Sequence, residues 1–145
     1  MNGFDGKIEQ GGSLDIYDLA SDTWSTRTYV ADGISGPTPR SVSACLPVAV
    51  SGRPMLVTLF GERDPSSLGH QGAGKMLGDV WAYDIASNVW SEVETRCVES
   101  SDGPTPRGWF DADIVDGSAI LVVGGLGGTN ERLSDAWLLQ LKAEA

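Results

Sequence analysis

The sequence predicts an all-β fold made of repeated units, on three observations. The segment 14–25 recurs as 80–91, with Tyr, Asp, Ala-Ser, Trp and Ser in the same places. The run Gly-Pro-Thr-Pro-Arg at 36–40 also recurs at 103–107, and a third copy of the first segment begins at 135. The 19 glycines and 7 prolines are spread along the chain, as turns between many short strands require. The apolar period of a helix is absent throughout.

Each repeat reads as a four-stranded unit, the pattern of a β-propeller blade. The strands expected in the middle unit are 40–48, 55–60, 79–85 and 89–94. Those expected in the following unit are 107–115, 120–125 and 135–141. Trp24 and Trp90 stand at equivalent places in the repeat, so we expect both to fill space between neighbouring blades.

The expected strands do not make a whole number of blades. Two precede residue 36, four lie in the middle unit and three follow residue 107. We therefore expect a partial propeller of about two and a half four-stranded blades, in which 1–35 ends one blade, 36–102 is complete and 103–145 lacks its closing strand. Because such a piece exposes strand edges, we expect the remaining blades or another chain to complete it.

The composition excludes several classes of partner. The net charge is -10, from 20 acidic and 10 basic residues, so the basic patch of a nucleic-acid-binding protein is missing. No apolar window is long enough to span a membrane, and the first residues have no apolar core of a signal peptide. These features predict a cytoplasmic protein with no nucleic-acid or membrane partner.

The longest predicted loop, 61–78, combines the only histidine of the chain, His70, with Glu62 and Asp64. Loops of this length inside compact domains are usually functional or disordered. One imidazole and two carboxylates suit Fe(II), Mn(II) or Zn(II), and three ligands leave coordination positions open for a substrate. The alternative is a polar loop in which His70 caps a backbone group.

Arg107 and Trp109 form a second candidate site, where an innermost strand is expected to begin. An arginine and a tryptophan at the axial mouth of a propeller could bind an anionic or flat ligand. Alternatively, Arg107 pairs with a turn carboxylate and Trp109 packs against the blade. The sequence leaves both readings open.

The repeat resembles the kelch repeat, with an apolar strand, Gly-Gly, a variable loop, and then an aromatic residue and a Trp about seven residues apart. The loop 62–74, the Arg107-Gly108-Trp109 start, and the segment 121–135 look more narrowly like the C-terminal part of the nitrile-specifier, epithiospecifier and thiocyanate-forming proteins. The most specific parts are His-x-Gly-x-Gly at 70–74 and Thr-Asn-x-Arg at 129–132. The resemblance implies a six-bladed kelch propeller, of which this chain is the last two and a half blades.

The resemblance also implies a ferrous site. In that family Fe(II) is held by a Glu, an Asp four residues later and a His four residues after that; Glu62 and His70 match the outer positions. The middle position is Ser66 here, and Asp64, which precedes Pro65 as the family's Asp precedes a Pro, is the nearest carboxylate. Trp109 matches an aromatic residue that lines the family's substrate pocket. The family's anion-binding arginines would lie N-terminal to this chain.

Two functions remain open from the sequence. The resemblance implies a specifier-like lyase or isomerase that acts with Fe(II) on unstable thiohydroximate sulfates, the glucosinolate aglycones, to direct nitrile, epithionitrile or thiocyanate formation in a complete propeller. The alternative is a kelch module for protein–protein interaction without catalysis, because a fold does not assign a function. The small-molecule partner would be an anion in the first case, and the partner a protein in the second.

Overall fold

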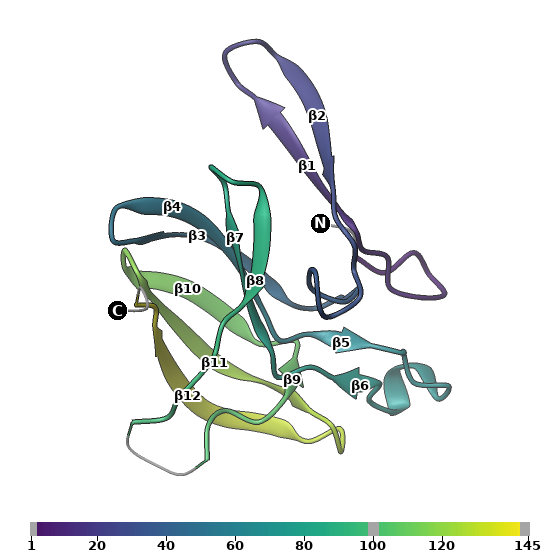
Figure 1. The fold of residues 1–145 in the computed structure, drawn as a ribbon. Coiled ribbons are helices and arrows are strands. Elements are labelled where there is room, and N and C mark those ends of the chain that lie inside the picture. Colours follow the sequence, from purple (N-terminus) through teal and green to yellow (C-terminus); the bar gives the residue numbers. More distant parts are fainter. Residues whose placement is uncertain (1–2, 99–101, 143–145) are drawn as a thin grey trace.

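The computed structural model describes residues 3–98 and 102–142, and in that part of the chain the fold is all-β (Figure 1). This confirms the predicted fold class. Its one helical element is the short 3-10 turn η1 (Gly69–Gln71). The strands pair as small antiparallel sheets, as expected for a piece of a β-propeller. Among the described residues, no helix has the length and apolarity needed to cross a membrane.

The first four-stranded sheet has the order β3-β4-β7-β8. Its strands are β3 (Ala44–Val50), β4 (Arg53–Leu59), β7 (Val80–Asp84) and β8 (Val89–Glu92). The second sheet has the order β10-β11-β12, and a short strand β9 also pairs with β11. Its strands are β9 (Arg107–Gly108), β10 (Asp111–Asp116), β11 (Ala119–Gly127) and β12 (Arg132–Gln140).

The hydrophobic core lies between these two sheets, which face each other in Figure 1. The first sheet contributes Val57 and Leu59, and the second contributes Ile120 and Val122, all fully buried. Phe60 completes the cluster, and its ring meets the ring of Phe110 edge-on. Burial of each such side chain contributes about 1.5–3 kcal/mol, so the contact between the sheets is a main source of stability.

The hairpin of β1 (Ser13–Asp18) and β2 (Thr23–Thr28) projects away from both sheets (Figure 1). Its register aligns Tyr17 with Trp24, as β7 and β8 align Tyr83 with Trp90. Trp90 is only 5% exposed, between Tyr83 and Tyr29, which confirms its predicted packing role. Trp24 is 71% exposed, so the same prediction is wrong for Trp24 in this chain. The reason is that no described segment covers the far side of the hairpin.

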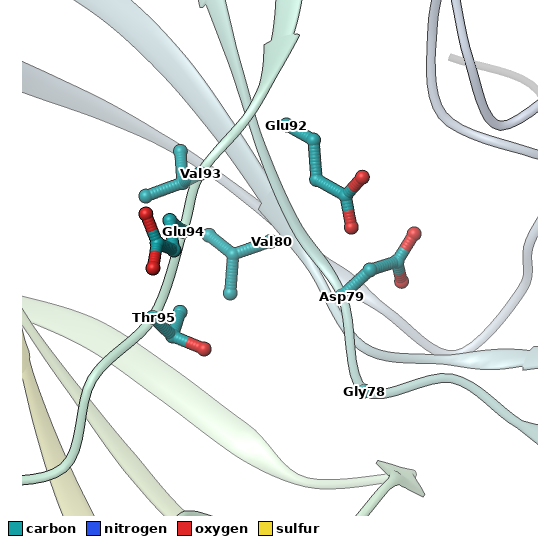
Figure 2. Close-up of a pocket in the computed structure, with 7 residues that line it drawn as sticks. All are labelled: Gly78, Asp79, Val80, Glu92, Val93, Glu94 and Thr95. Atoms are coloured by element: carbon teal, nitrogen blue, oxygen red, sulfur yellow. The ribbon is translucent and has the colours of Figure 1, made fainter.

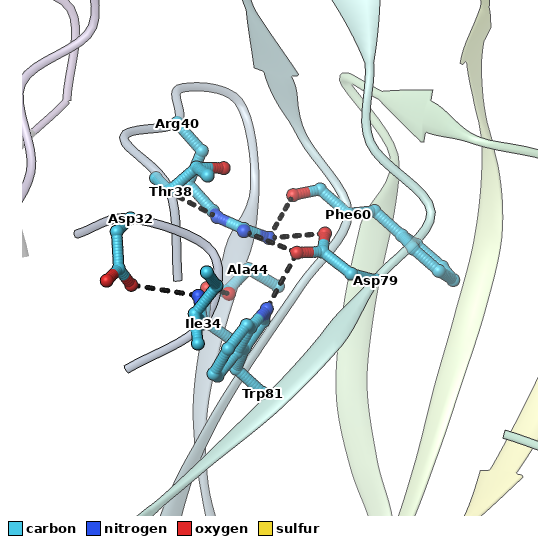
Figure 3. A network of polar contacts seen from close by, with 9 residues as sticks. Asp32, Ile34, Thr38, Arg40, Ala44, Phe60, Asp79 and Trp81 are labelled. Atoms are coloured by element: carbon cyan, nitrogen blue, oxygen red, sulfur yellow. Dashed lines mark hydrogen bonds and ion pairs between the residues drawn. The ribbon is translucent and has the colours of Figure 1, made fainter. Parts of the chain in front are cut away.

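Each of the two sheets contains its own polar network of an arginine, an aspartate and a tryptophan. The arginine ends the repeated Gly-Pro-Thr-Pro-Arg run, which explains why the run recurs. The Arg40 guanidinium donates to both carboxylate oxygens of Asp79, at 2.9 and 2.8 Å, and Trp81 Nε1 donates to Asp79 at 2.7 Å (Figure 3). Arg107 donates to Asp135 at 2.6 and 2.8 Å, and Trp137 Nε1 donates to Asp135 at 2.6 Å. Arg40 therefore joins the start of its unit to the residue that precedes β7, and Arg107 joins the start of its unit to β12.

The structure corrects two predicted strand boundaries. The strand predicted at 40–48 begins at Ala44 instead, and the one predicted at 107–115 is split into β9 and β10. The physical reason is a backbone kink two residues after each arginine, where Val42 and Trp109 have φ of 47° and 49°. A residue in this region cannot continue an extended strand.

Candidate functional site

The loop that follows β4 folds back on itself as a small two-stranded ladder. It comprises β5 (Glu62–Arg63), η1 and β6 (Lys75–Met76), and Glu62 lies opposite Met76. The backbone of Glu62 also exchanges two 2.9 Å hydrogen bonds with Ser41. Glu62 is therefore fixed from both sides, and its side chain is buried.

A backbone N–H orients the Glu62 carboxylate. Gly74 N donates to Glu62 Oε1 at 2.5 Å. A side chain at Gly74 would not fit, because its Cβ would lie 2.6 Å from both that oxygen and the carbonyl oxygen of Asp64. Burial raises the pKa of Glu62, the Gly74 N–H opposes this shift, and the nearby negative charge of Glu9 adds to it. The loop thus holds one oriented carboxylate in a setting that disfavours its charged form.

Glu9, which sequence reasoning missed, lies next to this carboxylate. It is 5% exposed, and Ser41 Oγ donates to its Oε1 at 3.1 Å. Its Oε2 is buried and has no hydrogen-bond partner. Neither Glu9 nor Glu62 forms an ion pair within residues 3–98 and 102–142. No local pattern marks Glu9, because its burial arises only when its loop docks on Ser41.

Of the other two predicted metal ligands, only Asp64 has a described side chain. Asp64 has φ of 51°, and its exposed carboxylate pairs with Arg63 at 3.0 Å. His70 lies in η1, and its side chain falls outside the described part of the structure. Ser66, at the middle position of the family's spacing, accepts a hydrogen bond from Leu68 N through its Oγ. Among the described side chains, no three of His, Cys, Asp or Glu are grouped as a metal site.

The loop that joins β11 to β12 reaches the same region. Asn130 Nδ2 donates to the carbonyl oxygen of Gln71 in η1 at 3.4 Å. Within that loop, Thr129 N donates to Glu131 Oε2 at 2.9 Å. The two segments on which the family resemblance is most specific, 70–74 and 129–132, are therefore neighbours in space.

Arg107 and Trp109 adopt different environments. The Arg107 side chain is 0% exposed, and its five N–H donors go to Thr105, Gly124 and Asp135. It therefore offers no free donor to an anion, and its described role is to pair with a carboxylate, which lies on β12 and not in a turn. Trp109 remains 45% exposed at the kink between β9 and β10.

A cavity of about 430 Å³ opens between β7 and the segment that follows β8 (Figure 2). Its carboxylates come from Asp79, Glu92 and Glu94. Asp79 is already engaged by Arg40 and Trp81, and Glu94 accepts hydrogen bonds from Arg96. None of the predicted site residues lines this cavity, so it adds nothing to the candidate site.

Comparison with known proteins finds two informative relatives. The chain is 29% identical over 140 residues to the N-(sulfonatooxy)prop-2-enimidothioate sulfolyase of Thlaspi arvense, covering 92% of this chain and 36% of that protein. It is 37% identical over 79 residues to the Adagio-like protein 3 of Oryza sativa subsp. japonica, covering 52% of this chain and 11% of that protein. The chain thus spans only a minor part of the length of either relative. No family model matches the sequence.

Proposed function

We propose that this chain is part of a specifier-like propeller that acts on sulfated thiohydroximates and directs nitrile, epithionitrile or thiocyanate formation. The observation that supports this most is the similarity to a sulfolyase over 92% of the chain. The substrate class is therefore a small anion that carries a sulfate ester and a sulfur atom. Because the chain spans about a third of that relative, the remaining blades are part of the proposal.

Fe(II) is the metal that this proposal requires, with Glu62 and His70 as its first ligands. Glu62 fits the role, because it is buried and oriented by Gly74, which leaves its second oxygen for a cation. Asp64 would join as a third ligand only after leaving its ion pair with Arg63. When bound, the metal would supply a Lewis acid for the substrate sulfur. Trp109, an exposed residue, would line the substrate pocket.

Titration of the protein with Fe(II) under anaerobic conditions, and with Zn(II), tests this proposal. We expect saturable binding by calorimetry that weakens about tenfold or more in His70→Ala and in Glu62→Gln, because each change removes a ligand. Asp64→Asn separates the two arrangements of the loop, since it weakens binding only if Asp64 leaves Arg63. The control Asp116→Asn changes an exposed carboxylate on β10. Equal binding in all these variants, or no binding to the unmodified chain, would contradict a metal site in this loop.

The second candidate function, protein–protein interaction, is supported by the exposed apolar surface of the β1–β2 hairpin. Trp24 is far more exposed than its counterpart Trp90, and Leu19 is also exposed. Strand β7 pairs with β8 along one edge and with β4 along the other. Its counterpart in the repeat, β1, pairs along one edge with β2 and has no second neighbour among the described strands. The partner that fits is an apolar antiparallel strand, which would pair with β1 as β4 pairs with β7.

A labelled peptide that copies residues 41–61, which contain β3 and β4, provides the probe for this surface. We expect it to bind the chain, and Trp24→Ala to weaken that binding about tenfold, because a central aromatic side chain dominates such contacts. Fluorescence anisotropy measures the affinity. Val98→Ala, at an exposed apolar residue away from the hairpin, should leave it unchanged. Lack of binding, or an equal loss in both variants, would count against the hairpin as a docking surface.

A further inference from the structure

The face of the second sheet that is turned away from the first sheet, here called the outer face, is apolar and uncovered. Its apolar residues are Leu121 and Val123 of β11 and, opposite them, Leu138 and Ala136 of β12. Leu138 is 61% exposed and Val123 is 47% exposed, whereas the residues between them in β11 point to the first sheet and are fully buried. None of the four outer-face residues belongs to a hydrophobic cluster of the described part of the chain.

The first sheet shows what covers the equivalent face elsewhere in the repeat. The two arginine networks align β4 with β11, because each arginine also donates to one carbonyl oxygen, that of Phe60 or that of Gly124. By this alignment, the two outer-face residues of β11 occupy the places of Val57 and Leu59 on β4. Val57 and Leu59 are 0% exposed, because the second sheet packs on them. The object that covers this face in the repeat is therefore another β-sheet of the same kind.

The first long strand of the outer face differs from its counterpart in charge. Strand β10 places Asp111 and Asp113 opposite the two outer-face residues of β11. In the first sheet, the residues opposite the equivalent positions of β4 are Ala44 and Leu46, which pack in the core between the sheets. Neither aspartate forms an ion pair in the part of the chain that the structure describes. The outer face is therefore an apolar surface with an acidic strip, Asp111 and Asp113, along β10.

A partner that covers the acidic strip has to bring positive charge, because a carboxylate that loses water without a counter-charge is costly. A second copy of this chain does not fit this requirement. Its net charge is -10, so two copies repel each other. Its own exposed aromatic surface, Tyr17 paired with Trp24 on the β1–β2 hairpin, shares its face with Asp15 and with no basic residue. The charge of the strip therefore selects a different, basic partner.

We propose that the outer face docks a further blade of the proposed propeller, a β-sheet whose first long strand carries lysine or arginine opposite the acidic strip. The inference rests on the proposed function in one respect: the blade comes from a longer protein, since this chain covers 36% of its sulfolyase relative. The apolar residues of β11 and β12 supply the contact area. The basic residues select this blade over an uncharged one, because complementary charges across an interface fix the register and exclude wrong partners.

The contact between the two described sheets indicates where the basic residues of the docked blade lie. Strand β10 contacts β3 and contributes Ala112 and Ile114 to the core that the two sheets share. The docked blade would place its first long strand over β10 in the same way. Its residues equivalent to Ala112 and Ile114 are therefore the ones that would be lysine or arginine.

The probe for this surface is a labelled hairpin peptide that copies residues 111–123 and is closed between its ends, which the register places opposite each other. One form carries Ala112→Lys and Ile114→Lys, and the other keeps the native sequence. We expect the lysine form to bind the whole chain at least about tenfold more tightly in fluorescence anisotropy at low salt, because only this form pairs with the acidic strip. Asp111→Asn combined with Asp113→Asn in the chain should remove this preference.

Two further variants separate the acidic strip from charge elsewhere and from apolar contact. Asp15→Asn combined with Glu92→Gln removes two exposed carboxylates away from the outer face and should leave the preference for the lysine form intact. Leu138→Ala should weaken both forms, because it removes exposed apolar surface that the docked sheet covers.

Three results would overturn the proposal: equal binding of the two peptides, an unchanged preference in the double asparagine variant, and no binding of a lysine form that circular dichroism shows to be a hairpin. Dimers of the unmodified chain in sedimentation equilibrium, lost in Leu138→Ala, would assign the face to a second copy instead. His70→Ala should leave peptide binding intact, so failure of this inference is distinguishable from failure of the Fe(II) titration.

Discussion

Replacing Asp79 by alanine should lower the free energy of unfolding by about 3–5 kcal/mol, the usual cost of removing one partner from a buried ion pair. The side chain of Arg40 is 0% exposed, and two of its nitrogens donate to Asp79. Without the carboxylate, its positive charge stays buried and Trp81 Nε1 also loses its acceptor. Urea denaturation measures the loss, and Asp116→Ala, at an exposed position of β10, is the control.

A double-mutant cycle separates the ion pair from the loss of the aspartate itself. If the pair is the cause, Arg40→Met combined with Asp79→Ala should cost clearly less than the two single changes added together. Asp135→Ala repeats the experiment in the second sheet, where we expect a smaller loss because Asp135 is more exposed than Asp79. Strict additivity of the Arg40 and Asp79 changes would show that the two side chains contribute independently.

The acid sensitivity of the protein gives a second readout of the same ion pairs. Burial raises the pKa of Asp79, but hydrogen bonds and charge from Arg40 outweigh burial, and its pKa is lowered. Hydrogen bonds from Arg107 hold the pKa of Asp135 well below its usual range. A carboxylate with a lowered folded-state pKa stabilises the protein above the unfolded-state value, about 3.9, and this contribution is lost as the pH falls through the folded-state pKa. Stability should therefore decrease below about pH 4, and less steeply in Asp79→Ala.

The sequence predicted the strands because repetition makes a local pattern visible twice. It did not predict the pair of Arg40 with Asp79, because these residues are far apart in the chain and meet only after the sheet forms. A signal was nevertheless present, since both units carry Asp-x-Trp, at Asp79 and at Asp135, opposite an arginine that ends a repeated run. Spacing alone could not tell a ligand-binding Arg107 from one whose donors are all used within the protein.

The candidate site in the loop 61–78 stays a prediction from the sequence. The loop position and Glu62 were accessible from sequence, because a long polar loop with acidic residues and the only histidine stands out. The contribution of Glu9 was not, since it depends on the docking of a different loop on Ser41. Trp24 shows the opposite case, because a repeat predicts which face is apolar but not whether a neighbour covers that face.

Gly61→Ala should destabilise the protein by more than about 2 kcal/mol, because it combines backbone strain with a steric clash. Gly61 has φ of 106°, which L-residues rarely adopt. An added Cβ would lie 2.6 Å from the carbonyl oxygen of Ser41 and 2.8 Å from the Cβ of Ser43. Neither atom belongs to the far end of a flexible side chain, so the backbone itself would have to move. Thermal or urea denaturation measures the effect.

Gly52→Ala is the matched control for this change. Gly52 also has a positive φ, 78°, but an added Cβ would have nothing within 4 Å, so only the backbone cost of about 1 kcal/mol remains. The difference between the two variants measures how tightly the chain packs where β4 ends. Because Gly61 N donates to the carbonyl oxygen of Arg107 and Glu62 follows directly, Gly61→Ala should also weaken the Fe(II) binding that we propose at Glu62. If Gly61→Ala costs no more than Gly52→Ala, the close approach at Ser41 does not constrain the loop, and the orientation of Glu62 must rest on Gly74 alone.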